Sequence, residues 1–534
     1  MSSKKLVKTS LTVATDILTS DKMEDPTVID AEKPIKLTFN EDLDIKTVSK
    51  GIKLFKIKSD GEEVEEDIVI TFEENSADTL YINKSSQSIS SGEEYKLSIN
   101  TQLSSLSGAS LKKEFISYFT ADYSFNLSKE GISDLNNNRS LIMVISDLHL
   151  GANDSYAEIN QNRGALVDFL KQVRFSPHVK ELVISGDLID EWFIPMHVDT
   201  FNGKTQRDFV KTVAANNKPV IDAFNDIITD GNIKVTYVPG NHDLLIDSGD
   251  IQSILPGISE ARDVKGLGAY VPQDFPELII EHGHRYNFFC APDFSNRPIT
   301  NTDSILPPGY FFTRMATTSV IEGRPENQAT LPEVHKNELS VEQLGYFLYW
   351  NVWKSLIMEF PVNEGLEKKV LNTNIDGLND LYAINDFLPY QNSENDYIDV
   401  YLHKGIIESW DERQNNNLVP IKIPLEEAIL KAALASHMDD QSRVQFFENP
   451  ESDKRIVIFG HSHEARVIIN SSEGEKQIYV NSGTWIDKNK CTMTFVVVTP
   501  PKNKDATPAF VNLYQYSSNG DIKKLESQAI TNLK

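Results

Sequence analysis

The chain has 534 residues, more than the roughly 250 to 300 that one hydrophobic core usually serves, so two or three domains are expected. Hydrophobic residues make up 40% and charged residues 24%, as in globular proteins, and no run of about 18 apolar residues predicts a membrane-spanning helix. The 52 basic and 78 acidic residues give a net charge of −26, which argues against general nucleic-acid binding.

The cysteines and the first residues of the chain narrow the possibilities further. Cys290 and Cys491 are the only cysteines and lie far apart, which excludes a disulfide framework and a cysteine-based zinc site. Residues 1–20 include lysines but no apolar run of about 7 to 15 residues, so they do not predict a secretory signal. The compartment therefore has to be inferred from other features.

Residues 33–120 alternate short apolar runs with turn-forming residues. Six such runs predict a small β-sandwich, and they lie at 35–39, 52–57, 67–72, 79–83, 95–100 and 115–121. With LTFNEDLD near its start, SGEEYKLSI before a central strand and YFTA at its end, the region resembles a bacterial Ig-like module. We expect this module at 25–122, after an N-terminal extension at 1–24. The resemblance implies a spacer or adhesion module, or a domain that only packs on its neighbour.

A polar stretch at 128–140 predicts a linker, placed at 123–140, and the pattern changes after it. Apolar runs now end abruptly in polar residues, and helical patterns at 162–174 and 218–230 separate the first three runs. Strands that alternate with helices predict a largely parallel sheet, in which ligand sites form beyond the carboxyl ends of the strands. The runs are LIMVIS before Asp147, ELVIS before Gly186, IKVTYVP before Gly240, ELIIE before His282 and RIVIF before Gly460.

About 170 residues between Arg285 and Lys454 contain no further motif of this kind. Helical patterns at 340–360 and 424–438 predict an inserted helical cap at about 290–450, within an α/β domain at 141–534. Strands expected at 477–485, 492–498 and 510–516 would complete a second sheet. The cap also contains aromatic residues that we expect in its core or in an oligomer contact rather than around an apolar part of a substrate, namely Tyr346, Phe347, Tyr349, Trp350 and Trp353.

Five motifs follow the predicted strands and supply metal-binding side chains. The two side chains of an Asp-x-His turn can reach one ion, and a carboxylate such as Asp187 can bridge two ions about 3.5 to 4 Å apart. Amide and imidazole ligands without thiolate suit Mn, Fe, Zn, Co or Ni, and Gly186, Gly240 and Gly460 permit sharp turns. The motifs are Asp147-Leu148-His149, Gly186-Asp187, Gly240-Asn241-His242-Asp243, His282-Gly283-His284 and Gly460-His461-Ser462-His463.

In this order, the motifs resemble those of the calcineurin-like metallophosphoesterases over residues 140–498. The resemblance implies an α/β fold, a four-layer αββα sandwich of two mixed sheets with helices outside. It also implies two divalent metal ions, with Mn or Zn favoured. One ion would be held by Asp147, His149, Asp187 and His463, and the other by Asp187, Asn241, His282 and His461, with His284 as an alternative to His282.

The resemblance also implies roles for residues that do not bind metal. His242 would touch the phosphate and the leaving-group oxygen, and Asp243 would hold its imidazole. Asp190 and Trp192 are expected beside the pocket, or as packing residues. Two arginines of the cap, Arg297 and Arg314, are candidates to clamp a second phosphate or a carboxylate, although each alone is more often a surface or structural arginine.

The motif spelling is closest to one branch of this family. SDLHLG at 146–151, GDLIDEW at 186–192 and HGHRY at 282–286 are similar to the UDP-diacylglucosamine pyrophosphohydrolases. That branch commonly has arginine where this chain has His242, and it lacks an Ig-like domain and so long a cap. The similarity therefore implies a phosphodiester or pyrophosphate substrate without identifying it.

The expected function is hydrolysis of a phosphodiester, pyrophosphate or phosphomonoester of a small molecule, nucleotide-linked or lipid-linked. A hydroxide bridging the metals would attack phosphorus, and His242 would assist departure of the alkoxide. A nuclease is an alternative that the charge argues against, and a non-catalytic binding module would have lost ligands that are all present here. An Ig-like domain favours a periplasmic or secreted location over the cytoplasm.

Overall fold

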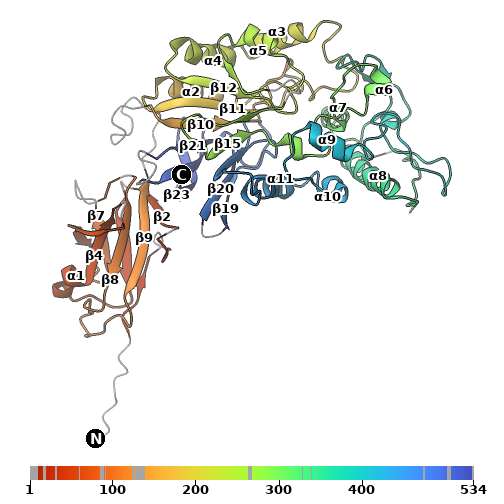
Figure 1. Ribbon diagram of the computed structural model, residues 1–534. Helices are drawn as coiled ribbons and strands as arrows, with labels where there is room; N and C mark the ends of the chain where they lie inside the picture. The colour runs from red at the N-terminus through yellow and green to blue at the C-terminus, as the bar shows by residue number, and fades with distance from the viewer. Residues whose placement is uncertain are drawn as a thin grey trace.

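A computed structural model shows an N-terminal all-β region followed by a larger α/β region (Figure 1). Much of the expected extension at 1–24 and most of the expected linker at 123–140 lie outside the described residues. Among the described residues, no helix combines the length and apolar character that a membrane crossing requires. The structure describes residues 10–15, 20–23, 25–30, 33–58, 61–83, 89–90, 92–122, 127, 139–262, 267–327, 329–337, 339–472, 475–501 and 507–531.

The N-terminal region is a sandwich of two sheets, as the alternating pattern predicts. Leu37, Leu54 and Leu97 are fully buried between the sheets, while their strand neighbours face outward. One sheet has the order β1-β3-β7-β6, with β1 Val13–Ala14, β3 Ile35–Phe39, β7 Thr79–Asn83 and β6 Val69–Phe72. The other has the order β2-β9-β8-β4-β5, with β2 Thr27–Asp30, β9 Phe115–Asp122, β8 Glu94–Ile99, β4 Ile52–Ile57 and β5 Glu63–Glu66, and α1 spans Ile45–Gly51.

Three short edge strands of this sandwich were not predicted. The strands β1 and β2 have two and four residues, too few to show a period-2 pattern, and β5 reads EVEE without apolar alternation. The strand β1 lies within the segment expected as an extension, and it pairs antiparallel with β3. Tertiary pairing rather than local pattern therefore determines these edges.

The α/β region contains two mixed sheets. In the larger one β10, β11 and β12 run parallel, whereas β21 pairs antiparallel with β10. Its order is β13-β12-β11-β10-β21-β22-β23, with β13 Ser259–Glu260, β12 Lys234–Val238, β11 Val179–Ser185, β10 Leu141–Ile145, β21 Thr494–Thr499, β22 Ala509–Tyr516 and β23 Ile522–Ile530. The smaller has the order β14-β15-β18-β20-β19, with β14 Ala269–Tyr270, β15 Leu278–Glu281, β18 Ile456–Phe459, β20 Glu475–Asn481 and β19 Arg466–Ser472.

The two sheets and their helices form four layers. Met143 and Ile145 of β10 face the helices, and Ile142 and Val144 face the second sheet, so the strand reads as a continuous apolar run. The far side of the second sheet packs through Phe459 on the helical cap. The expected αββα sandwich is therefore confirmed, and the helices over the first sheet are α2 Arg163–Phe175, α3 Gln206–Asn216, α4 Lys218–Asp230 and α5 Ser248–Ile254 (Figure 1).

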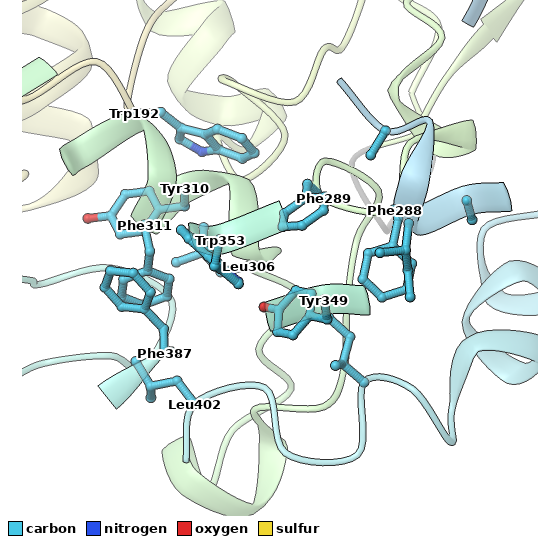
Figure 2. Close-up of a cluster of buried hydrophobic side chains, with 14 of the residues drawn as sticks. Trp192, Phe288, Phe289, Leu306, Tyr310, Phe311, Tyr349, Trp353, Phe387 and Leu402 are labelled. Carbon is cyan, nitrogen blue, oxygen red and sulfur yellow. The ribbon is translucent and has the colours of Figure 1, made fainter. Parts of the chain in front are cut away.

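The cap is helical with long irregular connections. Its expected aromatic residues Tyr346, Tyr349, Trp350 and Trp353 are at most 3% exposed and share one apolar cluster with Phe347, which is only partly buried. Figure 2 shows Tyr349 and Trp353 in this cluster. The four buried residues therefore form cap core. The helices are α6 Arg297–Thr300, α7 Pro308–Ile321, α8 Val341–Glu359, α9 Trp410–Asn416, α10 Leu425–Leu430 and α11 Ala435–Ser442, and β16 Leu371–Asn372 pairs with β17 Leu381–Tyr382.

The N-terminal sandwich packs on the edge of the larger sheet that β23 forms. Its strand β2 lies beside β23 (Figure 1), and the buried carboxylate of Asp122 forms an ion pair with Lys524 of β23. Asp25 lies 2.5 Å from Lys476 of β20 in a second ion pair. Because a buried carboxylate is costly without a partner, the first pair ties the two regions together.

Candidate metal centre

All five motifs leave the carboxyl ends of strands. The turns after β10, β11 and β12 carry Asp147, Asp187 and Asn241, and those after β15 and β18 carry His282 and His461. Because β10, β11 and β12 are parallel in one sheet and β15 and β18 in the other, these ends meet at one edge of the sandwich.

The backbone at this edge is strained in a way that the sequence does not reveal. Five of the expected ligands have left-handed backbone angles, which residues other than glycine rarely adopt. Such strain collects at functional sites because the surrounding fold holds it in place. The φ angles are 53° at Asp147, 47° at His149, 51° at Asp187, 67° at His461 and 58° at His463.

Two glycines are required by close approach to the ligands. A Cβ atom on Gly240 would lie 2.1 Å from Oδ1 of Asp187, and one on Gly186 would lie 2.2 Å from Nδ1 of His282. Gly186 also has a φ of 90°. Both distances are below van der Waals contact, so no larger residue fits without moving a ligand.

Four side chains form the first candidate ion site, Asp147, His149, Asp187 and His463. Their ligand atoms all lie within 4.8 Å of one another. Nε2 of His463 lies 3.1 Å from Nε2 of His149 and 3.1 Å from Oδ1 of Asp147. This set coincides with the ligands expected for one ion.

The second candidate ion site shares Asp187 with the first. Nε2 of His282 lies 3.1 Å from Oδ2 of Asp187 and 3.1 Å from Oδ1 of Asn241. The His461 ring stands edge-on to the His282 ring, with centroids 5.2 Å apart. The structure therefore brings all seven expected ligands together around Asp187.

The hydrogen bonds of two histidines test whether these sites suit metal ions. Nδ1 of His282 donates to the carbonyl of Ser185 over 2.8 Å, and Nδ1 of His149 donates to Asp190 over 2.9 Å. In the neutral tautomers each Nε2 then carries a lone pair that faces the lone pairs of other acceptors. These acceptors repel one another unless a cation lies between them. The site therefore offers nitrogen and oxygen donors, without thiolate, that could hold divalent metal ions.

Burial and neighbouring charges strongly shift the pKa values of side chains in the site. Burial opposes the charge of Asp187, but the nearby His282 and His242 outweigh it and hold the Asp187 pKa well below its usual range. Burial and the neighbouring His282 lower the pKa of His461 to about 3. A low pKa favours the neutral imidazole that binds metal, whereas Asp187 and Asp147 outweigh burial and raise the pKa of His282 to about 9, so metal binding there would release a proton.

His242 lies beside the ligands and is oriented by Asp190. Its Nδ1 donates to Oδ1 of Asp190 over 2.8 Å, and its ring stacks on Trp192 with centroids 4.8 Å apart. Asp190 therefore holds both His242 and the ligand His149. Asp190 and Trp192 are both buried and neither lines the cavity, so they support His242 from behind as packing residues.

The expectation for Asp243 is wrong. Its carboxylate accepts the backbone N–H groups of Gly240 and Leu188, each over 2.7 Å, and of Ile189 over 3.3 Å, so it joins two ligand turns instead of holding the imidazole of His242. The expectation rested on the adjacency of Asp243 and His242 in the sequence. In the structure the side chain of Asp243 points toward the turn after β11.

His284, the alternative ligand, lies next to His282 and does not contact the other ligands by a hydrogen bond among the described residues. It is buried with its ring centroid 5.4 Å from that of His282, and neither ring nitrogen has a hydrogen-bond partner among the described residues. Burial and the neighbouring His282 hold the pKa of His284 well below its usual range. His282, and not His284, contacts Asp187 and Asn241.

Neither arginine expected as a phosphate clamp reaches the site. Arg314 is fully buried, and its guanidinium donates to the carbonyls of Ile194, Pro195 and Asn372, so it joins α7 to the segment after Trp192. Arg297 lies over the Phe294 ring and pairs with the exposed Asp303. The basic residues that line a cavity of about 640 Å³ beside the centre are instead Arg324 and Lys488, which no sequence motif marks.

Comparisons with known proteins agree with this geometry. Residues 140–465 match the calcineurin-like phosphoesterase family, and residues 19–126 match the bacterial Ig-like domain. No curated protein is similar enough to match the chain.

Similar solved structures are distant. One is described as a 5′-nucleotidase from Staphylococcus aureus in complex with α-ketoglutarate, with 11% identity, 74% of this chain and 54% of that chain covered, and a TM-score of 0.23. Another is native α2-macroglobulin from Escherichia coli, with 12% identity, 26% and 7% covered, and a TM-score of 0.16. The chain spans about half or less of the length of these structures. The phosphoesterase match covers more than half of the chain and all five motifs, and the chain belongs to the calcineurin-like phosphoesterases.

Proposed function

We infer that the protein hydrolyses a phosphodiester, a pyrophosphate or a phosphomonoester of a small molecule with the help of two divalent metal ions, Mn or Zn being favoured. The convergence on Asp187 of imidazole lone pairs, carboxylates and an amide oxygen supports this function above all. Asp147, His149, Asp187 and His463 would hold one ion, and Asp187, Asn241, His282 and His461 the other.

When bound, two such ions neutralise the charge of the phosphate and lower the pKa of bound water to about 7. The remaining chemistry belongs to the chain. Asp190 fixes Nδ1 of His242, so Nε2 is the nitrogen available on the side of the cavity that His242 lines. Burial opposes protonation of His242, but Asp190 and Asp187 outweigh it and raise its pKa, which keeps a proton ready for the leaving-group oxygen.

A substrate panel tests this function. Phosphomonoesters, phosphodiesters and nucleotides would be assayed with Mn²⁺ for the wild type, Asp187→Asn and His242→Ala. We expect both variants to lose at least roughly 100-fold in kcat/KM. Asp303→Asn, which makes the same chemical change at an almost fully exposed side chain, is the matched control. Equal activity of all four proteins would reject the site, and cleavage of monoesters alone would reject the diesterase part.

The Ig-like domain supports a location outside the cytoplasm, in the periplasm or in the medium. Such modules serve as spacers or adhesion modules, and here the module is held to the catalytic region by the Asp122–Lys524 ion pair. Fractionation of the producing cells tests this location. Recovery of the protein only with cytoplasmic markers would contradict it.

A further inference from the structure

The cavity beside the metal centre has one wall built almost entirely of apolar side chains. His149, His242 and His463 line the cavity at the centre. Its volume of about 640 Å³ is large enough for a small organic molecule in addition to a phosphate group. The part of a substrate that does not react would therefore lie along this wall.

The apolar wall comes from the cap and from the turn after Trp192. Helix α7 contributes Phe312, Ala316, Val320 and Ile321, and the wall is completed by Phe193 and Phe360. The rings of Phe312 and Phe360 stand edge to face, with centroids 5.5 Å apart. These side chains offer surface for burial and no hydrogen-bonding groups.

A nucleobase would find little to recognise on this wall. Thr313 is the one polar side chain that α7 brings to the cavity, and its hydroxyl already donates to the carbonyl of Gly309 over 2.9 Å. A base edge buried there would leave its donors and acceptors unpaired, which costs free energy. A hydrocarbon group carries no such penalty.

The rim of the cavity adds two cations. Arg324 lies 5.1 Å over the Phe360 ring, Lys488 is exposed, and neither forms an ion pair with any described residue. Three carboxylates also line the cavity, and each is engaged: Asp154 with Arg163, Asp487 with the backbone N–H groups of residues 160–162, and Glu158 with Nδ1 of His149 at 3.3 Å. The rim therefore favours an anionic group, and the wall an apolar one.

We propose that the wall formed by α7, Phe193 and Phe360 binds a hydrocarbon group of the substrate, so that the enzyme prefers phosphate esters carrying an aliphatic chain. This deepens the proposed function and rests on it, because the metal centre at the end of the cavity supplies the position of the phosphorus atom. This wall thus favours an amphiphilic phosphate ester over a nucleotide, and the polar side chains of the cavity, among them Ser155, Asn160 and Gln161, lie outside it.

A homologous series tests this preference. The substrates are 4-nitrophenyl alkyl phosphodiesters with chains from methyl to octyl, and hydrolysis adds one water and yields the alkyl phosphate and 4-nitrophenol. We expect kcat/KM to rise about two- to fourfold for each added methylene, the increment that burial of a methylene confers. Thymidine 5′-(4-nitrophenyl phosphate) is the nucleoside arm, and a higher kcat/KM for it than for the octyl ester would overturn the proposal.

Two variants locate the preference on α7. Val320→Asp places a carboxylate in the wall and should abolish the dependence on chain length, whereas Ala316→Phe fills the cavity and should end the rise at shorter chains. Val341→Asp makes the same change at an exposed position of α8 and is the matched control, with the dependence retained. A slope that persists in both wall variants would contradict the proposal.

A binding measurement tests the hydrocarbon site independently of the proposed phosphoesterase function. Calorimetry with the Mn²⁺-loaded protein and alkylphosphonates of increasing length needs no turnover, and we expect affinity to rise with length in the wild type and not in Val320→Asp. Hydrolysis without any chain-length dependence leaves the phosphoesterase in place and removes the hydrocarbon site. Affinity that rises with chain length, without hydrolysis of any ester, would retain the hydrocarbon site and reject the phosphoesterase function.

Discussion

The carboxylate of Asp190 lies 2.8 Å from Nδ1 of His242 and fixes the imidazole beside the metal centre. The other oxygen of Asp190 accepts from Nδ1 of the ligand His149 over 2.9 Å. Backbone N–H groups of Trp192 and Phe193 also donate to Asp190, so the carboxylate is itself held in place. One buried residue therefore positions both the proposed proton donor and a metal ligand.

Asp190→Asn should reduce activity in a manner that depends on the leaving group. The neutral amide weakens the hold on the protonated form of His242, and general acid catalysis contributes about 10²- to 10⁴-fold. We expect a loss in that range for alkoxide leaving groups and a much smaller loss for 4-nitrophenolate, which needs no proton. Steady-state kinetics with both ester types measures the ratio. An equal loss for both would show that Asp190 acts only through His149, and metal content would then be reduced.

Gly240→Ala should disrupt the shared ligand. The new Cβ would meet Oδ1 of Asp187 at 2.1 Å and would force the carboxylate away from the position between the two sites. We expect bound metal to fall from two ions to at most one per chain, and activity to fall by roughly 100-fold. Elemental analysis of the purified protein measures the metal. Gly164→Ala, where the added Cβ meets open space on α2, is the control, and it should keep both ions.

Arg314→Lys should destabilise the attachment of the cap. The guanidinium is fully buried and donates to carbonyls of two separate segments, Ile194 and Pro195 in one and Asn372 of β16 in the other, and lysine cannot reproduce that fork. Carbonyls left without donors cost free energy, so we expect a loss of about 2 to 4 kcal/mol in the free energy of unfolding. Denaturant unfolding followed by tryptophan fluorescence measures it. The half-exposed Arg297→Lys should change stability by less than about 0.5 kcal/mol, and similar losses for the two variants would refute the structural role of Arg314.

Glu94→Gln should stabilise the N-terminal sandwich at neutral and alkaline pH. Burial, together with the adjacent Glu93, raises the pKa of Glu94 to about 7 from a usual value near 4.5. The folded state therefore binds the proton more tightly than the unfolded state, and stability falls as pH rises from about 4.5 through 7. After allowance for solvent screening, the variant should gain about 1 to 2 kcal/mol above pH 7 and little below pH 4.5. Thermal unfolding across this range measures the gain, and the exposed Glu62→Gln should show none.

The metal ligands were predictable from the sequence because each one lies within a few residues of the end of an apolar strand. An apolar run that ends in Asp, Asn or His places that side chain at a strand end, and parallel strands bring such ends together. The sequence left His282 and His284 as alternatives for one ligand, and the contacts of His282 with Asp187 and Asn241 decide between them. The same local logic predicted six strands of the N-terminal sandwich, since period-2 alternation reports burial on one face.

The tertiary structure alone decided which side chains meet across the site. That Asp190 rather than Asp243 holds His242, and that Arg314 supports α7 while Arg324 reaches the cavity, depends on side-chain directions that adjacency in sequence does not encode. The edge strand β1 could not be predicted for a related reason. Its two residues are too few to show an alternating pattern, and only their pairing with β3 identifies them as a strand. Local sequence thus determined the chemistry at the strand ends, and long-range packing determined its geometry and the shape of the substrate cavity.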